Sequence, residues 1–209
     1  MRIGIDMLGM QSPDHRGRGI GRYCVELSCA LFREASSHRF VLYRHDGLPA
    51  DGLPAGPNTS MRTLPRDPDA RTSSQALARI VAANPDGLDV LLQPSPFEPS
   101  ADFRLPDRPA HGLRLAAVVH DLIPLVFPER YLFDDRVRRR YHAAIAALRR
   151  YDAILMISEK TMPGSDLARE QRRDCPDPGR QGDVTWPSWK GMSLSDPPAS
   201  STTRSLPSS

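Results

Sequence analysis

Met1-Arg2-Ile3-Gly4-Ile5-Asp6 and Leu115-Ala116-Ala117-Val118-Val119-His120 are the two stretches that decide the fold. Each is a short apolar run that stops at a polar residue, a pattern typical of a strand buried on both faces of a parallel sheet. Comparable runs occupy residues 40–43, 89–92 and 153–157. A weaker run at 61–64 predicts an edge strand inside the Pro- and Gly-rich connection 47–71.

Helical patterns separate these runs. In the first, over residues 19–34, apolar side chains recur at three- and four-residue steps: Ile20, Tyr23, Cys24, Leu27 and Leu31. A second pattern covers residues 73–83, and a third begins after Asp134-Asp135, an acidic pair that suits a helix N-terminus. Strands that alternate with helices predict an α/β fold with a doubly wound, Rossmann-like parallel sheet.

The composition predicts one folded domain followed by a tail. The chain has 209 residues, of which 21 are Pro, and its apolar runs stop near residue 159. We assign residues 1–160 to the α/β domain. Residues 161–209 hold no apolar run longer than two residues, so we expect a low-complexity, disordered tail.

Charge and cysteine content argue against several classes of protein. The net charge of +3 is well below the clustered excess of a dedicated nucleic-acid binder, so we expect no nucleic-acid partner. Cys24, Cys29 and Cys175 are odd in number and lack metal-ligand spacing, which argues against a disulfide framework or structural zinc. No secretory leader and no apolar run of about 18 residues is present, so we expect a cytoplasmic protein.

A glycine-rich loop opens the first predicted helix. Gly17, Gly19, Gly21 and Arg22 lie where free backbone N–H groups and the positive end of the helix dipole favour an anion such as a phosphate. The G-x-G-x-G spacing differs from the G-x-G-x-x-G of dinucleotide-binding folds and lies about ten residues beyond the strand, which argues against NAD. A flexible loop that merely caps the helix is the alternative interpretation.

Other polar residues follow the remaining strands. Ligands of open parallel sheets bind outside the carboxyl ends of the strands, so these residues are candidates for one rim. We predict His120 as the catalytic residue at this rim, where it can donate or accept hydrogen bonds, although a purely structural histidine is the alternative. The other predicted rim residues are Ser95, Asp121, Ser158 and Glu159. His15, His45 and His111 are predicted to lie in loops without partners, and His38 and His142 are predicted to be pre-strand or helix-surface residues, so these five histidines receive no role.

Four segments in this order resemble glycosyltransferase family 4. They are residues 1–6, the loop 17–22 with Tyr23, the block Val119-His120-Asp121-Leu122-Ile123-Pro124-Leu125-Val126-Phe127-Pro128, and Ile154-Leu155-Met156-Ile157-Ser158-Glu159. The similarity covers about residues 1–160. It implies the N-terminal, acceptor-side half of a GT-B fold, in which two Rossmann-like domains face each other across a cleft.

The resemblance implies retaining transfer of a sugar from a nucleotide sugar to a glycan or lipid-linked acceptor, in polysaccharide or glycoconjugate biosynthesis. It implies no metal and no further cofactor. Gly19 and Gly21 would approach the donor phosphates, and His120 would contact the transferred sugar. The glutamate pair, eight residues apart, that marks the donor-binding half is absent after Glu159, because the last glutamate is Glu170. We therefore expect a truncated or frameshifted product that is inactive alone.

Two alternatives for function remain open, together with a membrane hypothesis. The chain could be a stand-alone acceptor-binding domain, or one subunit of a split transferase whose donor domain is a separate polypeptide. An NAD-dependent oxidoreductase is more remote. Arginines crowd the third predicted helix, which predicts peripheral contact with anionic lipid at the inner face of the plasma membrane. They are Arg136, Arg138, Arg139, Arg140, Arg149 and Arg150.

Overall fold

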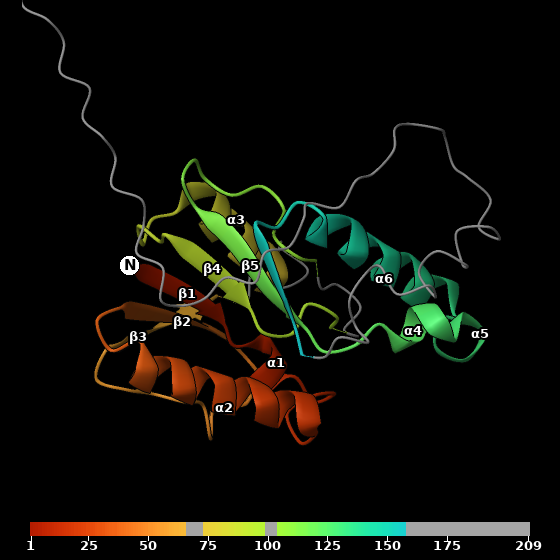
Figure 1. Ribbon diagram of the computed structural model, residues 1–209, viewed down its shortest axis with the longest axis horizontal. Coiled ribbons are helices and arrows are strands. Elements are labelled where there is room, and N and C mark those ends of the chain that lie inside the picture. The colour runs from red at the N-terminus through yellow and green to blue at the C-terminus, as the bar shows by residue number, and fades with distance from the viewer. Residues whose placement is uncertain (66–72, 99–103, 158–209) are drawn as a thin grey trace, which may run out of the picture. The chain divides into compact units, whose positions relative to one another are not determined.

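A computed structural model describes residues 1–65, 73–98 and 104–157, all of which belong to one compact unit. Six strands form one sheet in the order β3-β2-β1-β4-β5-β6, and every neighbouring pair is parallel (Figure 1). The strands are β1 (Arg2–Asp6), β2 (Arg39–His45), β3 (Thr59–Leu64), β4 (Val90–Gln93), β5 (Arg114–Val119) and β6 (Ala153–Met156). The predicted doubly wound α/β fold is confirmed, and β3 is the expected edge strand.

The three predicted helices are present with the expected bounds. They are α2 (Gly19–Glu34), α3 (Ser73–Ala83) and α6 (Asp135–Leu148). Asp134 caps α6, because its Oδ1 accepts hydrogen bonds from the amides of Arg136 at 2.7 Å and Val137 at 3.1 Å. The sequence analysis missed three one-turn helices, α1 (Leu8–Gln11), α4 (Ile123–Val126) and α5 (Pro128–Tyr131), which are too short to show helical periodicity.

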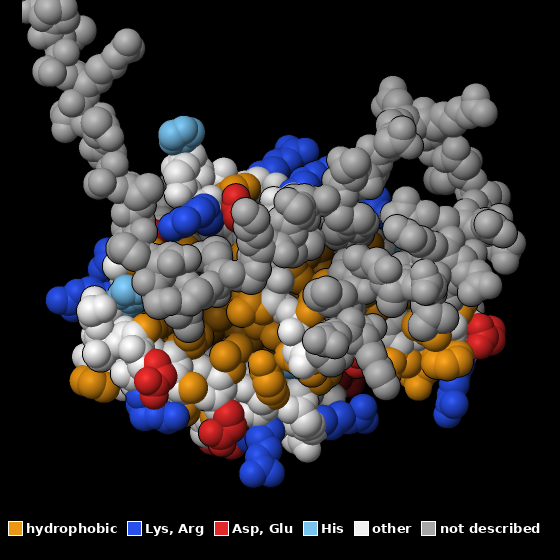
Figure 2. Space-filling view, in the orientation of Figure 1, with side chains coloured by type: hydrophobic (Ala, Val, Ile, Leu, Met, Phe, Trp, Pro, Cys, Tyr) orange, Lys and Arg blue, Asp and Glu red, His pale blue; other side chains and the backbone are white. Residues whose placement is uncertain are grey.

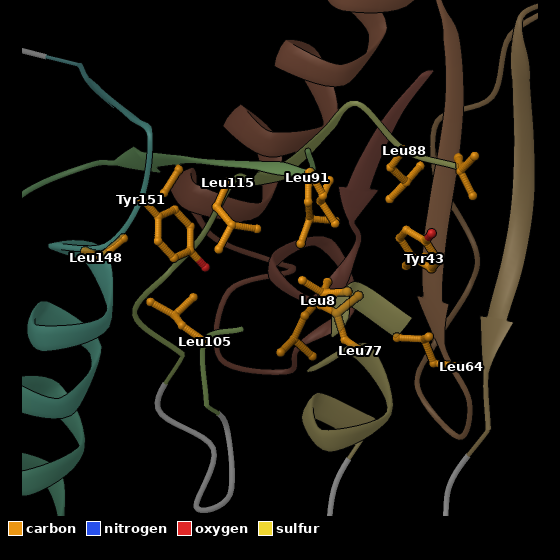
Figure 3. Close-up of a cluster of buried hydrophobic side chains, with 14 of the residues drawn as sticks. Leu8, Tyr43, Leu64, Leu77, Leu88, Leu91, Leu105, Leu115, Leu148 and Tyr151 are labelled. Atoms are coloured by element: carbon orange, nitrogen blue, oxygen red, sulfur yellow. The ribbon is translucent and has the colours of Figure 1, made fainter. Parts of the chain in front are cut away.

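Two apolar cores fill the two faces of the sheet. One core contains Cys24 and Phe32 of α2 against Ile5, Phe40 and Leu42. The other packs α3 and the end of α6 against strands β2, β3, β4 and β5. Figure 3 shows members of this second core, including Leu77 of α3, Leu148 of α6, Leu91 of β4 and Leu115 of β5. Because both faces are covered, the central strands are apolar throughout, as the sequence indicates.

A buried polar group holds the chain just beyond β1. Asp6 Oδ1 lies 2.6 Å from His45 Nε2 and accepts a hydrogen bond from the amide of Leu8 at 3.1 Å. The Gln11 side chain bridges to β2, accepting from the amide of His45 at 2.8 Å and donating to the carbonyl of Pro49 at 3.0 Å. His45 was predicted to be a loop residue without partners, and that prediction is wrong: it ends β2 and is fully buried. This group fixes the direction in which the chain leaves β1.

Several predictions fall outside the described residues. Ser158, Glu159, the boundary at residue 160 and the disorder predicted for 161–209 all lie there. In the described ranges, no helix is long and apolar enough to span a bilayer. The same ranges contain no group of three or more His, Cys, Asp or Glu side chains placed to share a metal ion.

Candidate active site

The glycine loop ends at an uncapped helix N-terminus. Arg18 is the N-cap residue of α2, its side chain makes no capping hydrogen bond, and the first turn carries no acidic residue. The amides of Gly19 and Ile20 donate no hydrogen bond to any residue in the described part of the chain. Gly17, Arg18 and Gly19 are exposed. The start of α2 therefore presents unpaired N–H groups and the positive end of its dipole to an incoming anion.

Gly21 allows the loop to fold back against α2. The carbonyl oxygen of His15 accepts hydrogen bonds from the amides of Arg18 at 2.9 Å and Gly21 at 3.2 Å. A Cβ on Gly21 would lie 2.5 Å from that oxygen and 2.8 Å from Arg16 Cα. A Cβ on Gly17 or Gly19 would meet nothing within 4 Å. Of the three glycines, Gly21 is the one that close backbone approach requires.

His120 stands at the end of β5, where the sequence places it. Its Nε2–H donates a hydrogen bond of 2.9 Å to the carbonyl of Pro94, which follows β4. The Tyr23 ring on α2 meets the imidazole edge to face, with ring centroids 4.9 Å apart and planes at 86°. This contact brings the first helical turns of α2 and the end of β5 together. The predicted glycine loop and His120 therefore lie on the same rim of the sheet.

The environment of His120 favours the neutral imidazole. Burial lowers the pKa of His120 below its ordinary value of 6.5, while the hydrogen bond to Pro94 and the negative charge of Asp121 act in the opposite direction. With the proton on Nε2, the lone pair of Nδ1 is available. No residue in the described ranges hydrogen-bonds to Nδ1. The side chain can thus accept a hydrogen bond from a ligand hydroxyl near neutral pH.

Pro94 links three elements beneath the rim. Besides the His120 hydrogen bond, its carbonyl accepts one from the Cys24 thiol of α2, with Sγ 3.5 Å away. Burial raises the pKa of Cys24 to about 12, and the negative charges of Asp6 and Glu98 act in the same direction. Cys24 is therefore a packing residue with an unreactive thiol, not a nucleophile.

Ser95 belongs to a buried polar cluster with His15, Glu98 and Ser12, none of which was predicted to have a role. Ser95 is only 4% exposed, so it lies beneath the predicted rim instead of open on it. Its Oγ is 3.2 Å from Nδ1 of His15, and the same nitrogen is 3.2 Å from Oε2 of Glu98. Oε1 of Glu98 accepts a hydrogen bond of 2.6 Å from Ser12. The prediction that His15 has no partner is wrong.

The remaining predicted residues have simpler environments. Asp121 Oδ1 accepts a hydrogen bond from the amide of Ile123 at 3.1 Å, so it supports the start of α4. Arg22 is exposed on the first turn of α2, and its amide bonds back to Arg18. Tyr23 was predicted to belong to the apolar face of its helix, but 38% of it is exposed and its ring contacts His120. An aromatic residue two positions after the last glycine of such a loop is too common to reveal this contact.

The arrangement suits a ligand that carries both an anion and hydroxyl groups. Free amides at the start of α2 favour negative charge, and Nδ1 of His120 favours a hydroxyl donor. The glycine loop is separated from β1 by α1, so the tight strand-to-helix turn of dinucleotide-binding folds is not formed. This geometry adds to the argument against NAD that the glycine spacing supplies.

Comparison with known proteins connects the chain to sugar transfer. No protein-family model matches it. A serotype-specific mannosyltransferase, WbdA of Escherichia coli, is 31% identical over 179 residues, a match that covers 76% of this chain and 21% of the mannosyltransferase. Two further Escherichia coli sequences of the same description are 35% identical over 91 and 95 residues, covering 43% and 44% of this chain.

The chain spans about a fifth of the first of these relatives and 11% and 12% of the other two. The chain is therefore homologous to a segment of a glycosyltransferase.

Proposed function

We propose that this chain forms the acceptor-side half of a retaining glycosyltransferase of family 4 with a GT-B fold, active in polysaccharide or glycoconjugate biosynthesis. The observation that carries the proposal is the contact of Tyr23 with His120, which unites the glycine loop and the histidine at one rim. The similarity to the mannosyltransferase supports the same assignment. By that similarity the transferred sugar is mannose, carried by a nucleoside diphosphate and delivered to a glycan or lipid-linked acceptor.

Each group at the rim has a role in this proposal. The amides of Gly19 and Ile20 approach the donor diphosphate, where the dipole of α2 stabilises the negative charge that grows as the sugar leaves. His120 is held in one orientation by Pro94 and Tyr23 and accepts a hydrogen bond from a sugar hydroxyl through Nδ1. Arg22 adds positive charge at the same turn. We propose no metal, because this electrostatic work is assigned to amides and cationic side chains.

The donor nucleotide is proposed to bind a second domain, supplied by a separate polypeptide or chain segment. The described residues form a single sheet, whereas the GT-B fold requires two facing domains. We therefore expect the chain alone to bind an acceptor without catalysing transfer. A stand-alone acceptor-binding domain makes the same binding prediction, but it would stay inactive after a donor domain is added.

The test combines binding with turnover. Mannose-containing oligosaccharides are titrated into the isotope-labelled chain, and the backbone amide signals of positions 120 and 121 at the rim are followed by nuclear magnetic resonance. We expect shifts that His120→Gln abolishes and that His142→Gln, at an exposed position on α6, leaves unchanged. Release of nucleoside diphosphate from a sugar nucleotide by the chain alone would contradict the proposed inactivity. Absence of any binding by the wild-type chain would contradict the acceptor role.

Membrane contact is a second proposal, carried by exposed side chains near α6. Phe127 is 50% exposed, Phe133 is 77% exposed, and Arg136 and Arg139 are exposed beside them in sequence. Figure 2 shows hydrophobic side chains near α4 and α5, with basic and acidic side chains beside them. Aromatic rings beside arginines suit the interface of an anionic bilayer, where a lipid-linked acceptor would be presented.

Vesicle cosedimentation tests the membrane proposal. At low salt the chain should pellet with vesicles that contain phosphatidylglycerol and stay in solution with phosphatidylcholine alone. Phe133→Ser should weaken pelleting, whereas Met61→Ser, at an exposed apolar residue of the edge strand β3, should not. A chain that stays in the supernatant with anionic vesicles would remove this surface from the proposed function.

A further inference from the structure

Glu98 is a buried carboxylate whose surroundings leave one oxygen without a hydrogen bond. Its side chain is 0% exposed. Oε1 accepts from Ser12, but Oε2 has no hydrogen-bond partner among the described residues and lies 3.2 Å from Nδ1 of His15. A buried carboxylate oxygen without a donor is costly, so the nearby imidazole N–H is the group that can satisfy it. Glu98 and His15 are therefore coupled.

His15 also holds the start of α2, through its backbone. Its carbonyl oxygen accepts from the amides of Arg18 and Gly21, and it is the atom that a Cβ on Gly21 would meet at 2.5 Å. One residue thus contacts the loop after β4 through its ring and the first turn of α2 through its carbonyl. Contacts that hold the ring between Ser95 and Glu98 restrict the backbone torsions of His15, and with them the position of the carbonyl on which the glycine loop rests.

We propose that Glu98 is a positioning residue that acts through His15 to hold residues 16–22 in the conformation that leaves the amides of Gly19 and Ile20 free for an anion. Ser95 and Ser12 complete the arrangement by contacting His15 and Glu98 respectively. The coupling of Glu98 to the loop follows from the geometry alone. Its consequence for diphosphate binding rests on the proposed function.

The coupling is tested by hydrogen exchange in the full 209-residue chain. Glu98→Gln keeps the volume of the side chain but removes the charge beside His15. Exchange of the Arg18 and Gly21 amides should accelerate about tenfold or more, because their acceptor loses its fixed position. Amides of β1 and α3 should keep wild-type rates. A merely structural role would instead accelerate all of these amides together, and that result would overturn the proposal.

A double-mutant cycle separates a specific coupling from general damage. In His15→Ala the contact is already lost, so adding Glu98→Gln should change loop exchange by less than twofold. If the two substitutions together accelerated exchange of the loop amides by the product of their separate effects, the proposal would be overturned. The matched control is Asp51→Asn, which removes the negative charge that pairs with Arg16 of the same loop. In this variant the exchange rate of the Gly21 amide should stay near that of the wild type. If Glu98→Gln fails to fold, Ser12→Ala removes the donor to Glu98 and should give the same local acceleration.

Inorganic pyrophosphate is the probe for the functional consequence. The wild-type chain should show pyrophosphate-dependent shifts of the Gly19 and Ile20 amides, and Glu98→Gln should weaken that binding by about tenfold. Local acceleration without any pyrophosphate binding would uphold the coupling and contradict the diphosphate role in the proposed function. Unchanged loop exchange in Glu98→Gln would overturn the coupling whatever the chain binds.

Discussion

Replacing Gly21 by alanine should destabilise the chain, whereas the same replacement two residues earlier should not. Both glycines lie in the first turn of α2. The new Cβ at Gly21 would lie 2.5 Å from the carbonyl oxygen of His15 and 2.9 Å from its carbonyl carbon, and both are backbone atoms that cannot rotate away. At Gly19 the same atom meets nothing within 4 Å. The two sites therefore differ in the space that a Cβ would find, and Gly21 also donates a hydrogen bond to His15 that Gly19 does not make.

The magnitude follows from three contributions. Forcing an extra methyl group into a packed site costs about 1–3 kcal/mol. Loss of the Gly21 amide hydrogen bond to His15 adds about 1 kcal/mol, and the higher helix propensity of alanine returns about 1 kcal/mol. Gly21→Ala should therefore lower the free energy of unfolding by about 2 kcal/mol, which corresponds to a fall in Tm of roughly 4–8 °C for a chain of this size. Gly19→Ala keeps only the propensity gain, so its Tm should be equal to or slightly above that of the wild type.

Urea unfolding followed by far-ultraviolet circular dichroism measures both variants against the wild type. The free energy of unfolding should fall with urea concentration at the same slope in all three proteins, so that a difference in midpoint reports a difference in stability. Equal midpoints for Gly21→Ala and Gly19→Ala would refute the close approach of His15 to the helix start. A more stable Gly21→Ala would refute the structure of the loop itself.

Three further outcomes are expected. Asp6→Ala should lower the free energy of unfolding measured in urea by about 1–3 kcal/mol, because it leaves a buried imidazole N–H of His45 without its acceptor, and an unchanged midpoint would contradict that pairing. Burial lowers the pKa of His120 in the folded chain, so the contribution of this side chain to stability is present above pH 6.5 and declines as the pH falls below that value. A nuclear magnetic resonance titration of the His120 ring should therefore give a midpoint below 6.5. A midpoint at or above 6.5 would contradict the burial. In a Cys175→Ser variant, a thiol reagent at pH 8 should modify Cys29 well before Cys24, whose pKa is raised to about 12; equal rates would show that Cys24 is accessible.

The sequence determined the fold because its signals are local and repeated. Apolar runs such as those ending at Asp6 and His120 can be buried on both faces only in a covered parallel sheet. Apolar residues recur at three- and four-residue steps from Ile20 to Leu31, and this pattern predicts a helix of several turns that agrees with the bounds of α2. The pattern over residues 73–83 agrees in the same way with the bounds of α3. The same reasoning predicted a rim of polar residues, since the carboxyl ends of parallel strands lie at one edge of a sheet.

Tertiary structure alone decided which polar residues meet. His15 and Glu98 are 83 positions apart, and neither belongs to a periodic pattern, so nothing local indicates that the imidazole and the carboxylate approach to 3.2 Å. No local signal indicates the approach of Asp6 to His45 or the ring contact of Tyr23 with His120 either. Periodicity reports which face of an element is buried, whereas a contact between loops depends on how far each chain segment travels after its strand ends. The course of these loops is set by packing across the whole sheet. It places the imidazole of His120 against the ring of Tyr23, near the N-terminus of α2.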